Sequence, residues 1–161
     1  MNRKLYLLGL LLLFFHASFA QRTFVDTFST AEGEKISIEV IDYAKFGISN
    51  AFVIVANDET EYSQLKKEIK SCPSFQKNKS RIFLSCIPSE KFDSNTYLAL
   101  VEHILSSYKL LDSRLFLIDE GQATQAYVEK AERNQIKKAV AILNQEDIKT
   151  NFCGEIDRQL R

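Results

Sequence analysis

Four short runs of apolar residues divide the chain and predict the strands of a buried sheet. The clearest run is Ala51–Ala56, in which every residue is apolar. Similar runs occupy residues 81–87, 114–118 and 138–143. Continuous apolar runs of this length are typical of strands buried on both faces, as in a parallel sheet covered by helices.

The first part of the chain has a different pattern. Residues 22–29 alternate loosely, and residues 35–41 alternate polar and apolar side chains with a period of two. The turn sequence Glu32-Gly33-Glu34 lies between them. This arrangement predicts an antiparallel hairpin with one exposed face.

Helical patterns follow the apolar runs. Asp58 and Glu61 have capping-box spacing at the start of a helix that Pro73 is expected to stop. A second helix has an apolar stripe with a 3.6-residue period, made of Tyr97, Leu98, Val101, Ile104, Leu105 and Tyr108. Further helices are expected over residues 123–133 and 146–160. The last of them aligns Ile148, Phe152, Ile156 and Leu160 on one stripe despite Gly154.

The expected order is a hairpin followed by strands and helices in alternation. Such alternation with short connections indicates an α/β fold in three layers, with helices on both faces of a mostly parallel sheet. The N-terminal hairpin would form the antiparallel edge of that sheet. Residues 21–161 are therefore expected to form a single α/β domain.

Residues 1–20 have the pattern of a secretory signal peptide. Arg3 and Lys4 form a basic start, an apolar stretch runs from Leu5 to Phe15, and Ser18-Phe19-Ala20 resembles a cleavage site. The apolar stretch is shorter than the roughly 20 residues that a membrane span needs. We therefore expect a secreted or periplasmic protein with no membrane span after signal removal.

Charge and cysteine content narrow the possible partners. Without Arg3 and Lys4, 19 basic residues remain against 21 acidic ones, a net charge of −2 with no basic block. Nucleic acid binding is therefore not expected, and no cofactor is indicated. The three cysteines are Cys72, Cys86 and Cys153, whose pairing the sequence leaves open. Cys86 is expected inside a strand, where a free thiol packs as a small hydrophobe.

The helix pattern that ends at Tyr108, followed by the strand pattern over residues 111–117, resembles a secreted α/β-hydrolase of the esterase type, and the resemblance is specific mainly over residues 97–123. In that family a helix ending in tyrosine leads into a D-x-x-R-[IL]-[FY]-L motif, and the strand then enters the G-x-S-x-G nucleophile elbow. Here Tyr108 ends the helix, and Asp112-Ser113-Arg114-Leu115-Phe116-Leu117 follows. The resemblance implies the α/β-hydrolase fold, and a fold by itself carries no function.

The chain departs from this family where the chemistry would lie. Gly121 falls on the nucleophilic serine, so no side chain is available for attack. The expected oxyanion-hole loop reads Asn57-Asp58-Glu59, and carboxylates oppose a developing oxyanion. After residue 20 the only histidine is His103, which precedes the elbow instead of following it. The resemblance thus implies a truncated, catalytically degenerate relative.

Acidic residues follow the predicted parallel strands and form an alternative candidate site. The residues selected as a ligand or metal site are Asp58, Glu59, Asp119, Glu120 and Asp147. If these carboxylates converge, they could hold Mg²⁺ or Ca²⁺, which prefer oxygen ligands. Acids at helix N-termini also cap helices and complement the helix dipole, so a purely structural role is the competing interpretation.

Two functional classes therefore remain open. The leading expectation is an exported protein that binds another protein or a small ligand at the strand-end crevice. The alternative is an enzyme with a non-standard acidic site, whose carboxylates would act as acid and base or bind a divalent metal. A third expectation is a chain whose sheet is completed by a partner, which an uncovered edge strand would favour.

Overall fold

The computed structural model describes residues 21–44, 50–88, 91, 93–108, 110, 114–119 and 140–161. For residue 119 and residues 140–150 only the backbone is described. The expected signal segment over residues 1–20 and the expected helix over residues 123–133 lie outside the described residues. No helix in the described part is long and apolar enough to cross a membrane.

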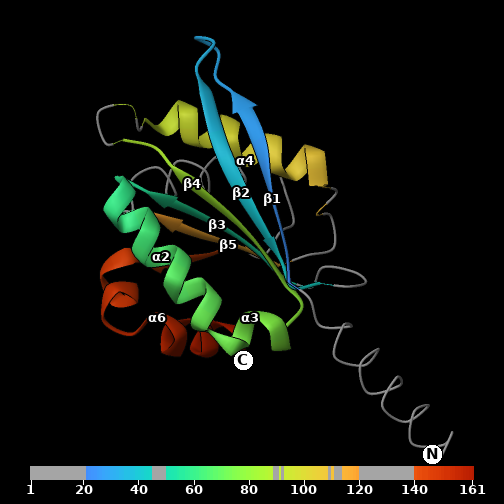
Figure 1. The fold of residues 1–161 in the computed structure, drawn as a ribbon, viewed down its shortest axis with the longest axis vertical. Helices are drawn as coiled ribbons and strands as arrows, with labels where there is room; N and C mark the ends of the chain where they lie inside the picture. The colour runs from blue at the N-terminus through green and yellow to red at the C-terminus, as the bar shows by residue number, and fades with distance from the viewer. Residues whose placement is uncertain are drawn as a thin grey trace, which may run out of the picture.

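The predicted N-terminal hairpin is present, but residues 38–42 of its second strand are buried on both faces, so the expectation of one exposed face is wrong for that part. Strand β1 (Arg22–Ser29) pairs antiparallel with β2 (Lys35–Asp42) in a continuous register. Gly33 has a φ of +84°, a left-handed conformation that glycine adopts without strain, and its amide donates to the Thr30 carbonyl at 3.0 Å. In Figure 1 the tip of this hairpin rises beyond the neighbouring strands.

Six strands form one sheet. To the hairpin are added β3 (Asn50–Ala56), β4 (Ser80–Cys86), β5 (Arg114–Asp119) and β6 (Val140–Asn144), in the order β1-β2-β4-β3-β5-β6. The last four strands in this order are parallel to one another, whereas β2 runs antiparallel to both β1 and β4. The prediction of an α/β sheet with an antiparallel hairpin at its edge is confirmed.

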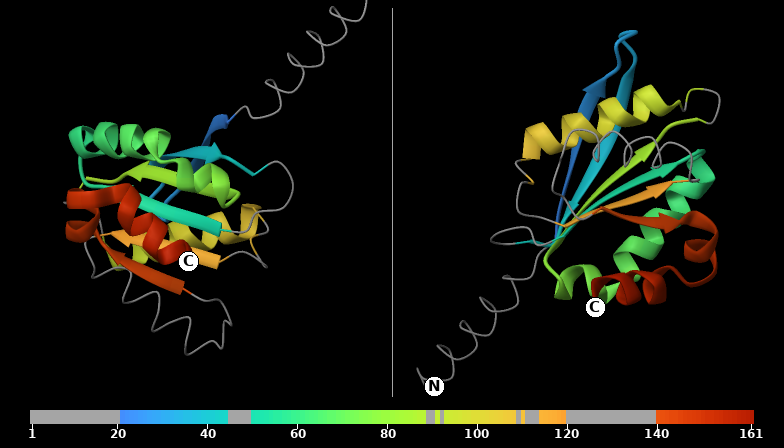
Figure 2. Two further views of the ribbon diagram at one scale, coloured as in Figure 1. Left: turned by 90° about the horizontal axis from the view of Figure 1, so that it is seen from below. Right: turned by 180° about the vertical axis from the view of Figure 1, so that it is seen from behind.

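Helices lie on both faces of the sheet (Figures 1 and 2). Helix α4 (Ser94–Tyr108) packs on one face, and α2 (Glu59–Ser71), α3 (Pro73–Lys77) and α6 (Gln145–Leu160) pack on the other. Successive strand residues point to opposite faces. The face under α4 buries Val53, Val55, Phe83, Leu115 and Leu117. The opposite face buries Phe52, Ile54, Ile82, Leu84, Phe116 and Ile118.

Two helices differ from the sequence expectation. Pro73 was expected to stop α2, but it also begins the short helix α3, because proline fits the first helical position, where no amide is required. The expected single stripe over residues 146–160 is interrupted at Asn151, whose φ of −156° and ψ of 67° are not helical. The Asn151 side chain accepts from the Gly154 amide at 3.2 Å and so caps the second half of α6.

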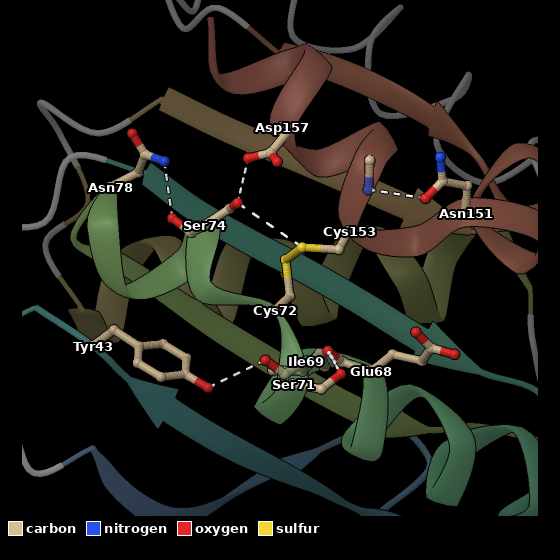
Figure 3. The surroundings of a disulfide bond; sticks show 11 residues. Tyr43, Glu68, Ile69, Ser71, Cys72, Ser74, Asn78, Asn151, Cys153 and Asp157 are labelled. Atoms are coloured by element: carbon tan, nitrogen blue, oxygen red, sulfur yellow. Dashed lines mark hydrogen bonds between the residues drawn. A yellow bond between two sulfur atoms is a disulfide. The ribbon is translucent and has the colours of Figure 1, made fainter.

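A disulfide joins Cys72 to Cys153 (Figure 3), and Cys86 is a free thiol. It connects the junction of α2 and α3 to α6 across 81 residues of sequence. Close to the disulfide, the Ser74 hydroxyl donates a hydrogen bond to the Asp157 carboxylate. The covalent bond and this hydrogen bond hold α6 against the α2–α3 side of the sheet.

Candidate functional site

The carboxyl ends of the parallel strands meet at one edge of the sheet. Ala56 lies beside Cys86, and Asp119 lies beside Asn144, at the last positions of their strands. In sheets of this kind, ligands bind in the crevice outside these ends. This edge is therefore where the candidate acidic residues have to be located.

Asp58 and Glu59 follow β3 at this edge, and both are exposed. The Asp58 carboxylate accepts from the Glu61 amide at 2.8 Å, and Glu61 Oε2 accepts from the Asn57 amide at 2.8 Å. The first bond satisfies an amide that the first turn of α2 leaves open, and the second satisfies the amide of the residue before the N-cap. The predicted capping interaction is confirmed, and the Asp58 carboxylate has a structural task whether or not it binds a ligand.

The side chains of the other three predicted site residues are outside the described part of the structure. Asp119 ends β5 and Asp147 belongs to the first half of α6, and for both only the backbone is described. Glu120 lies outside the described residues, as does Gly121 of the predicted elbow. Among the described side chains, no group of three or more histidine, cysteine or acidic residues could hold a metal. The acidic site stays a prediction.

A cavity of about 640 Å³ opens at the same edge, on the β4 side. Its walls come from the hairpin turn, the first turn of α2, the end of β4 and the segment that leads into α4. The lining residues are Thr30, Glu32, Glu34, Lys35, Ile36, Ser37, Glu59, Tyr62, Cys86, Ile87, Pro88, Lys91, Asp93 and Thr96. Its volume lies in the range of roughly 300–1,000 Å³ that small-molecule sites occupy.

The cavity wall carries more negative than positive charge. Of the described residues that line it, four carry carboxylates, against the ammonium groups of Lys35 and Lys91. Lys91 Nζ pairs with Glu34 Oε1 at 2.9 Å, which connects the hairpin to the segment before α4. The Asp93 carboxylate accepts from the Thr96 amide at 2.7 Å and so caps α4.

Cys86 contributes a free thiol to the cavity. It is the last residue of β4 and is partly exposed, so the expectation of a thiol packed inside the strand is wrong. Burial raises the pKa of this thiol, and the carboxylates of Glu59, Asp58 and Glu61 raise it further. Since the thiolate is the reactive form, the electrostatics here disfavour nucleophilic attack by Cys86.

Tyr62 connects the cavity wall to a buried charge. Its hydroxyl donates to Glu39 Oε2 at 2.5 Å, and Lys66 Nζ lies 2.6 Å from the same oxygen. Burial raises the pKa of the Tyr62 hydroxyl, and the Glu39 carboxylate adds to the shift. Tyr62 therefore presents a neutral, fixed ring to the cavity.

His103 lies away from this cavity. Its Nε2 is 3.4 Å from Asp26 Oδ2, and the Tyr108 hydroxyl donates to that same oxygen at 2.7 Å. This cluster joins α4 to β1, so the histidine has a structural partner. It is partly exposed on α4 and is not among the residues that line the cavity.

Sequence reasoning missed the residues that the fold brings to the cavity from the hairpin and from the approach to α4. Glu34 and Lys91 are 57 positions apart, and no local pattern connects them. One usable signal was the position of Cys86, two residues before Pro88 and thus at the end of its strand.

The sequence matches no protein-family model and no curated protein. Among solved structures, the chain is similar to one of two fungal esterases from Rhizomucor miehei, with a TM-score of 0.54 and 7% identity over 77% of this chain and 44% of the esterase. A thermostable carboxylesterase cloned from a metagenomic library is similar with a TM-score of 0.53 and 11% identity, over 79% of this chain and 48% of the carboxylesterase. A thermostable esterase from Pseudomonas putida is similar with a TM-score of 0.50 and 12% identity, over 81% of this chain and 46% of the esterase.

These similarities concern the fold. The chain spans less than half the length of each of these three esterases. At such low identity a shared fold does not transfer an activity, because function depends on the site residues. The chain therefore has an α/β fold of the kind found in α/β-hydrolase esterases.

Proposed function

We propose that this chain is an exported, catalytically degenerate α/β-hydrolase-like protein that binds a small, positively charged ligand. The observation that carries the proposal is the cavity of about 640 Å³ at the carboxyl ends of the parallel strands. A hydrolase-like fold offers its ligand crevice at this edge. The cavity combines suitable size with polar groups from four separate segments.

The charge of the cavity favours a cation as the ligand. Lys91 is neutralised by Glu34, and Lys35 then stands against Glu32, Glu59 and Asp93. A cleft lined mainly by one sign of charge concentrates ligands of the opposite sign. Tyr62 also lines the cavity, and its ring already attracts one ammonium group, because Lys66 Nζ lies 5.7 Å from the ring centroid.

The residues at the expected catalytic positions support binding over hydrolysis. Gly121 stands where the family's nucleophile would be, and the segment after β3 is acidic instead of glycine-rich. The raised pKa of Cys86 argues against a thiolate nucleophile in the cavity. Each of these features removes one component of an acyl-transfer site.

Two features support export. The first is the signal-like pattern of residues 1–20. The second is the bond between Cys72 and Cys153, because disulfides persist in oxidising compartments and are rare in the cytosol.

The test is isothermal titration of the purified protein with putrescine and lysinamide, with succinate as the anionic counterpart. Saturable binding of the amines and none of succinate is expected. The double variant Glu32→Gln/Glu59→Gln should weaken amine binding roughly tenfold or more, as expected when two charges that face a ligand are removed. Glu68→Gln on α2, which does not line the cavity, is the matched control and should bind as the wild type does.

Assays with p-nitrophenyl acetate address the degenerate part of the proposal. We expect no turnover above that of a heat-denatured sample. Turnover that is lost in the Cys86→Ser variant would contradict the proposal and identify a thiol esterase. Equal binding of amines and succinate, or no binding of either, would contradict the proposed ligand class.

One observation favours the alternative of an acidic, metal-dependent site. The parallel register of β3 and β5 brings Asp119 to the same edge as Asp58 and Glu59. Thermal melts with and without Mg²⁺ and Ca²⁺ test this reading. A rise in melting temperature that disappears in Asp119→Asn would support it, whereas identical melts with and without cations would exclude these metals as stabilising ligands.

A further inference from the structure

Strand β1 is an outer strand of the sheet, and among the described residues no further strand pairs with its far edge. Its register with β2 runs without a bulge over all eight residues, from Arg22 to Ser29. It contains neither proline nor lysine, which commonly blunt exposed edges. Figure 1 shows β1 at the side of the sheet, in front of α4 and away from α2 and α6.

The hydrogen-bond pattern shows which backbone groups of β1 point outward. The Thr30 amide donates to the Glu34 carbonyl at 2.8 Å, so this pair is of the hydrogen-bonded type. Such pairs alternate along an antiparallel ladder. Phe24, Asp26 and Phe28 therefore bond to β2, while Thr23, Val25 and Thr27 direct their amides and carbonyls away from it.

One of these outward amides is already occupied. The Thr27 amide donates to Asp26 Oδ1 at 2.7 Å. No described residue bonds the outward groups of Thr23 and Val25. The accessible part of the edge is therefore short and is centred on Phe24, which lies between these two residues.

The side chains at this centre are apolar and exposed. Phe24 is 44% exposed and Val25 is 67% exposed, and they are the exposed large hydrophobic side chains of the described part of the chain. Phe24 lies on the α4 face, with its ring 6.4 Å from that of Tyr108. Because successive strand residues point to opposite faces, each face of the open edge carries one exposed apolar side chain at its middle.

The flanking charges fit a second copy of the same strand. In an antiparallel pair centred on Phe24, Arg22 of each copy stands opposite Asp26 of the other, on the α4 face. A hydrogen bond from Tyr108 holds the pKa of Asp26 below its ordinary value, so this carboxylate is ionised. Within the same chain, the acid opposite Arg22 on β2 is Asp42. Its carboxylate already binds Arg81 and accepts from the Ala44 amide.

We propose that β1 pairs antiparallel with β1 of a second copy of this chain, centred on Phe24, and joins two sheets into one. The outward groups of Thr23 and Val25 bond to those of Val25 and Thr23 in the other copy. The two Phe24 rings lie opposite each other, and each is flanked by an Arg22–Asp26 pair. The bond between Thr27 and Asp26 stays intact.

Sedimentation equilibrium of the purified protein tests the association. The wild type should show a concentration-dependent rise to twice the monomer mass. Val25→Pro should be monomeric, because it removes an outward donor and leaves the bonds to β2 intact. Its melting temperature should match that of the wild type at a concentration where the wild type is also monomeric, which would show that folding is retained. A monomeric wild type at all concentrations would overturn the proposal.

Cysteine cross-linking tests the register in a Cys86→Ser background. In the proposed pairing, Phe24→Cys places two thiols at a non-hydrogen-bonded pair, where Cα atoms are roughly 4.5 Å apart and a disulfide can form. Thr27→Cys, exposed on the same strand, is the matched control and should not cross-link. Arg22→Glu should raise the dimer dissociation constant roughly tenfold, because it opposes two carboxylates. Cross-linking through Thr27→Cys, or equally through both positions, would overturn the register.

Discussion

The Tyr62 hydroxyl on α2 donates a 2.5 Å hydrogen bond to the Glu39 carboxylate on β2. The Glu39 side chain is 7% exposed, and Lys66 binds the same oxygen. Burial opposes ionisation of Glu39, but the hydrogen bonds from Lys66 and Tyr62 and the charges of Lys66 and Lys70 outweigh it. The pKa of the Glu39 carboxyl is therefore held below its ordinary value. The buried Glu39 carboxylate thus holds the hydroxyl of Tyr62, a residue that lines the cavity.

The free energy of unfolding should decrease in acid partly through Glu39. A carboxyl whose pKa is lower in the folded than in the unfolded state stabilises the fold at pH values above its ordinary pKa, which is 4.5 for this residue. That contribution is lost as the pH falls through the folded-state pKa. Urea unfolding at several pH values between 7 and 3 should show this loss, and Glu39→Gln should reduce the difference between pH 7 and pH 3.

Tyr62→Phe separates the hydrogen bond from the charge. The substitution should lower the free energy of unfolding at pH 7 by about 1–2 kcal/mol, because it removes one hydrogen-bond donor to a buried carboxylate. The acid-induced loss of stability should become smaller than in the wild type, since the pKa of Glu39 moves back toward its ordinary value. An acid response identical to that of the wild type in both variants would show that Glu39 does not contribute.

Local sequence patterns predicted the sheet because its strands are determined by burial. Ala51–Ala56 is apolar throughout and is buried on both faces, and residues 115–118 behave similarly. The alternation over residues 35–41 predicted a strand with two different faces, and the spacing of Asp58 and Glu61 predicted the start of α2. Each of these signals acts over a few residues, so one sequence suffices to detect it.

Features that depend on distant contacts were not predictable in the same way. The pairing of Cys72 with Cys153 requires α6 to pack beside α3, which no local spacing encodes. The cavity exists because the hairpin turn, α2 and the approach to α4 surround the end of β4. The break at Asn151 escaped notice because Phe152 and Ile156 keep their helical spacing after it. The convergence of Asp119 with Asp58 is a question of the same kind and stays a prediction.

Removal of the disulfide should destabilise the fold strongly. The bond closes a loop of 81 residues, for which the chain-entropy estimate is about 4 kcal/mol. The double variant Cys72→Ala/Cys153→Ala should lose roughly this free energy in guanidinium unfolding, and the wild type should lose a similar amount on reduction. Cys86→Ala is the control and should keep its sensitivity to reductant. Equal stability of the oxidised and reduced wild type would contradict the structural role of the bond.

Replacement of Gly154 by alanine should bring no net stability, although the residue lies within a helix. A Cβ at this position would overlap the carboxamide of Asn151, which caps the second half of α6. Gly154→Ala should therefore lose the cap, at a cost of about 1 kcal/mol in the free energy of unfolding, and this loss should cancel the roughly 1 kcal/mol by which alanine favours helix over glycine. In an Asn151→Ala background the same change should be stabilising. Additive effects of the two substitutions would contradict this coupling.

The thiol of Cys86 should react slowly for a partly exposed cysteine. Burial raises its pKa, and the carboxylates of Glu59, Asp58 and Glu61 add to the shift. Iodoacetamide alkylation followed by mass spectrometry should give a pH–rate profile whose inflection lies above the ordinary thiol value. Because Cys72 and Cys153 are joined, this rate reports on Cys86 in the unreduced protein.

Glu59→Gln should accelerate alkylation at neutral pH several-fold, because it removes a charge that opposes the thiolate. Glu68→Gln, on the same helix and outside the cavity, should leave the rate unchanged. An inflection below the ordinary thiol value would contradict the electrostatics described here. Cys86 would then be an activated nucleophile at the strand-end edge, and the binding proposal would give way to an enzyme that uses this thiol.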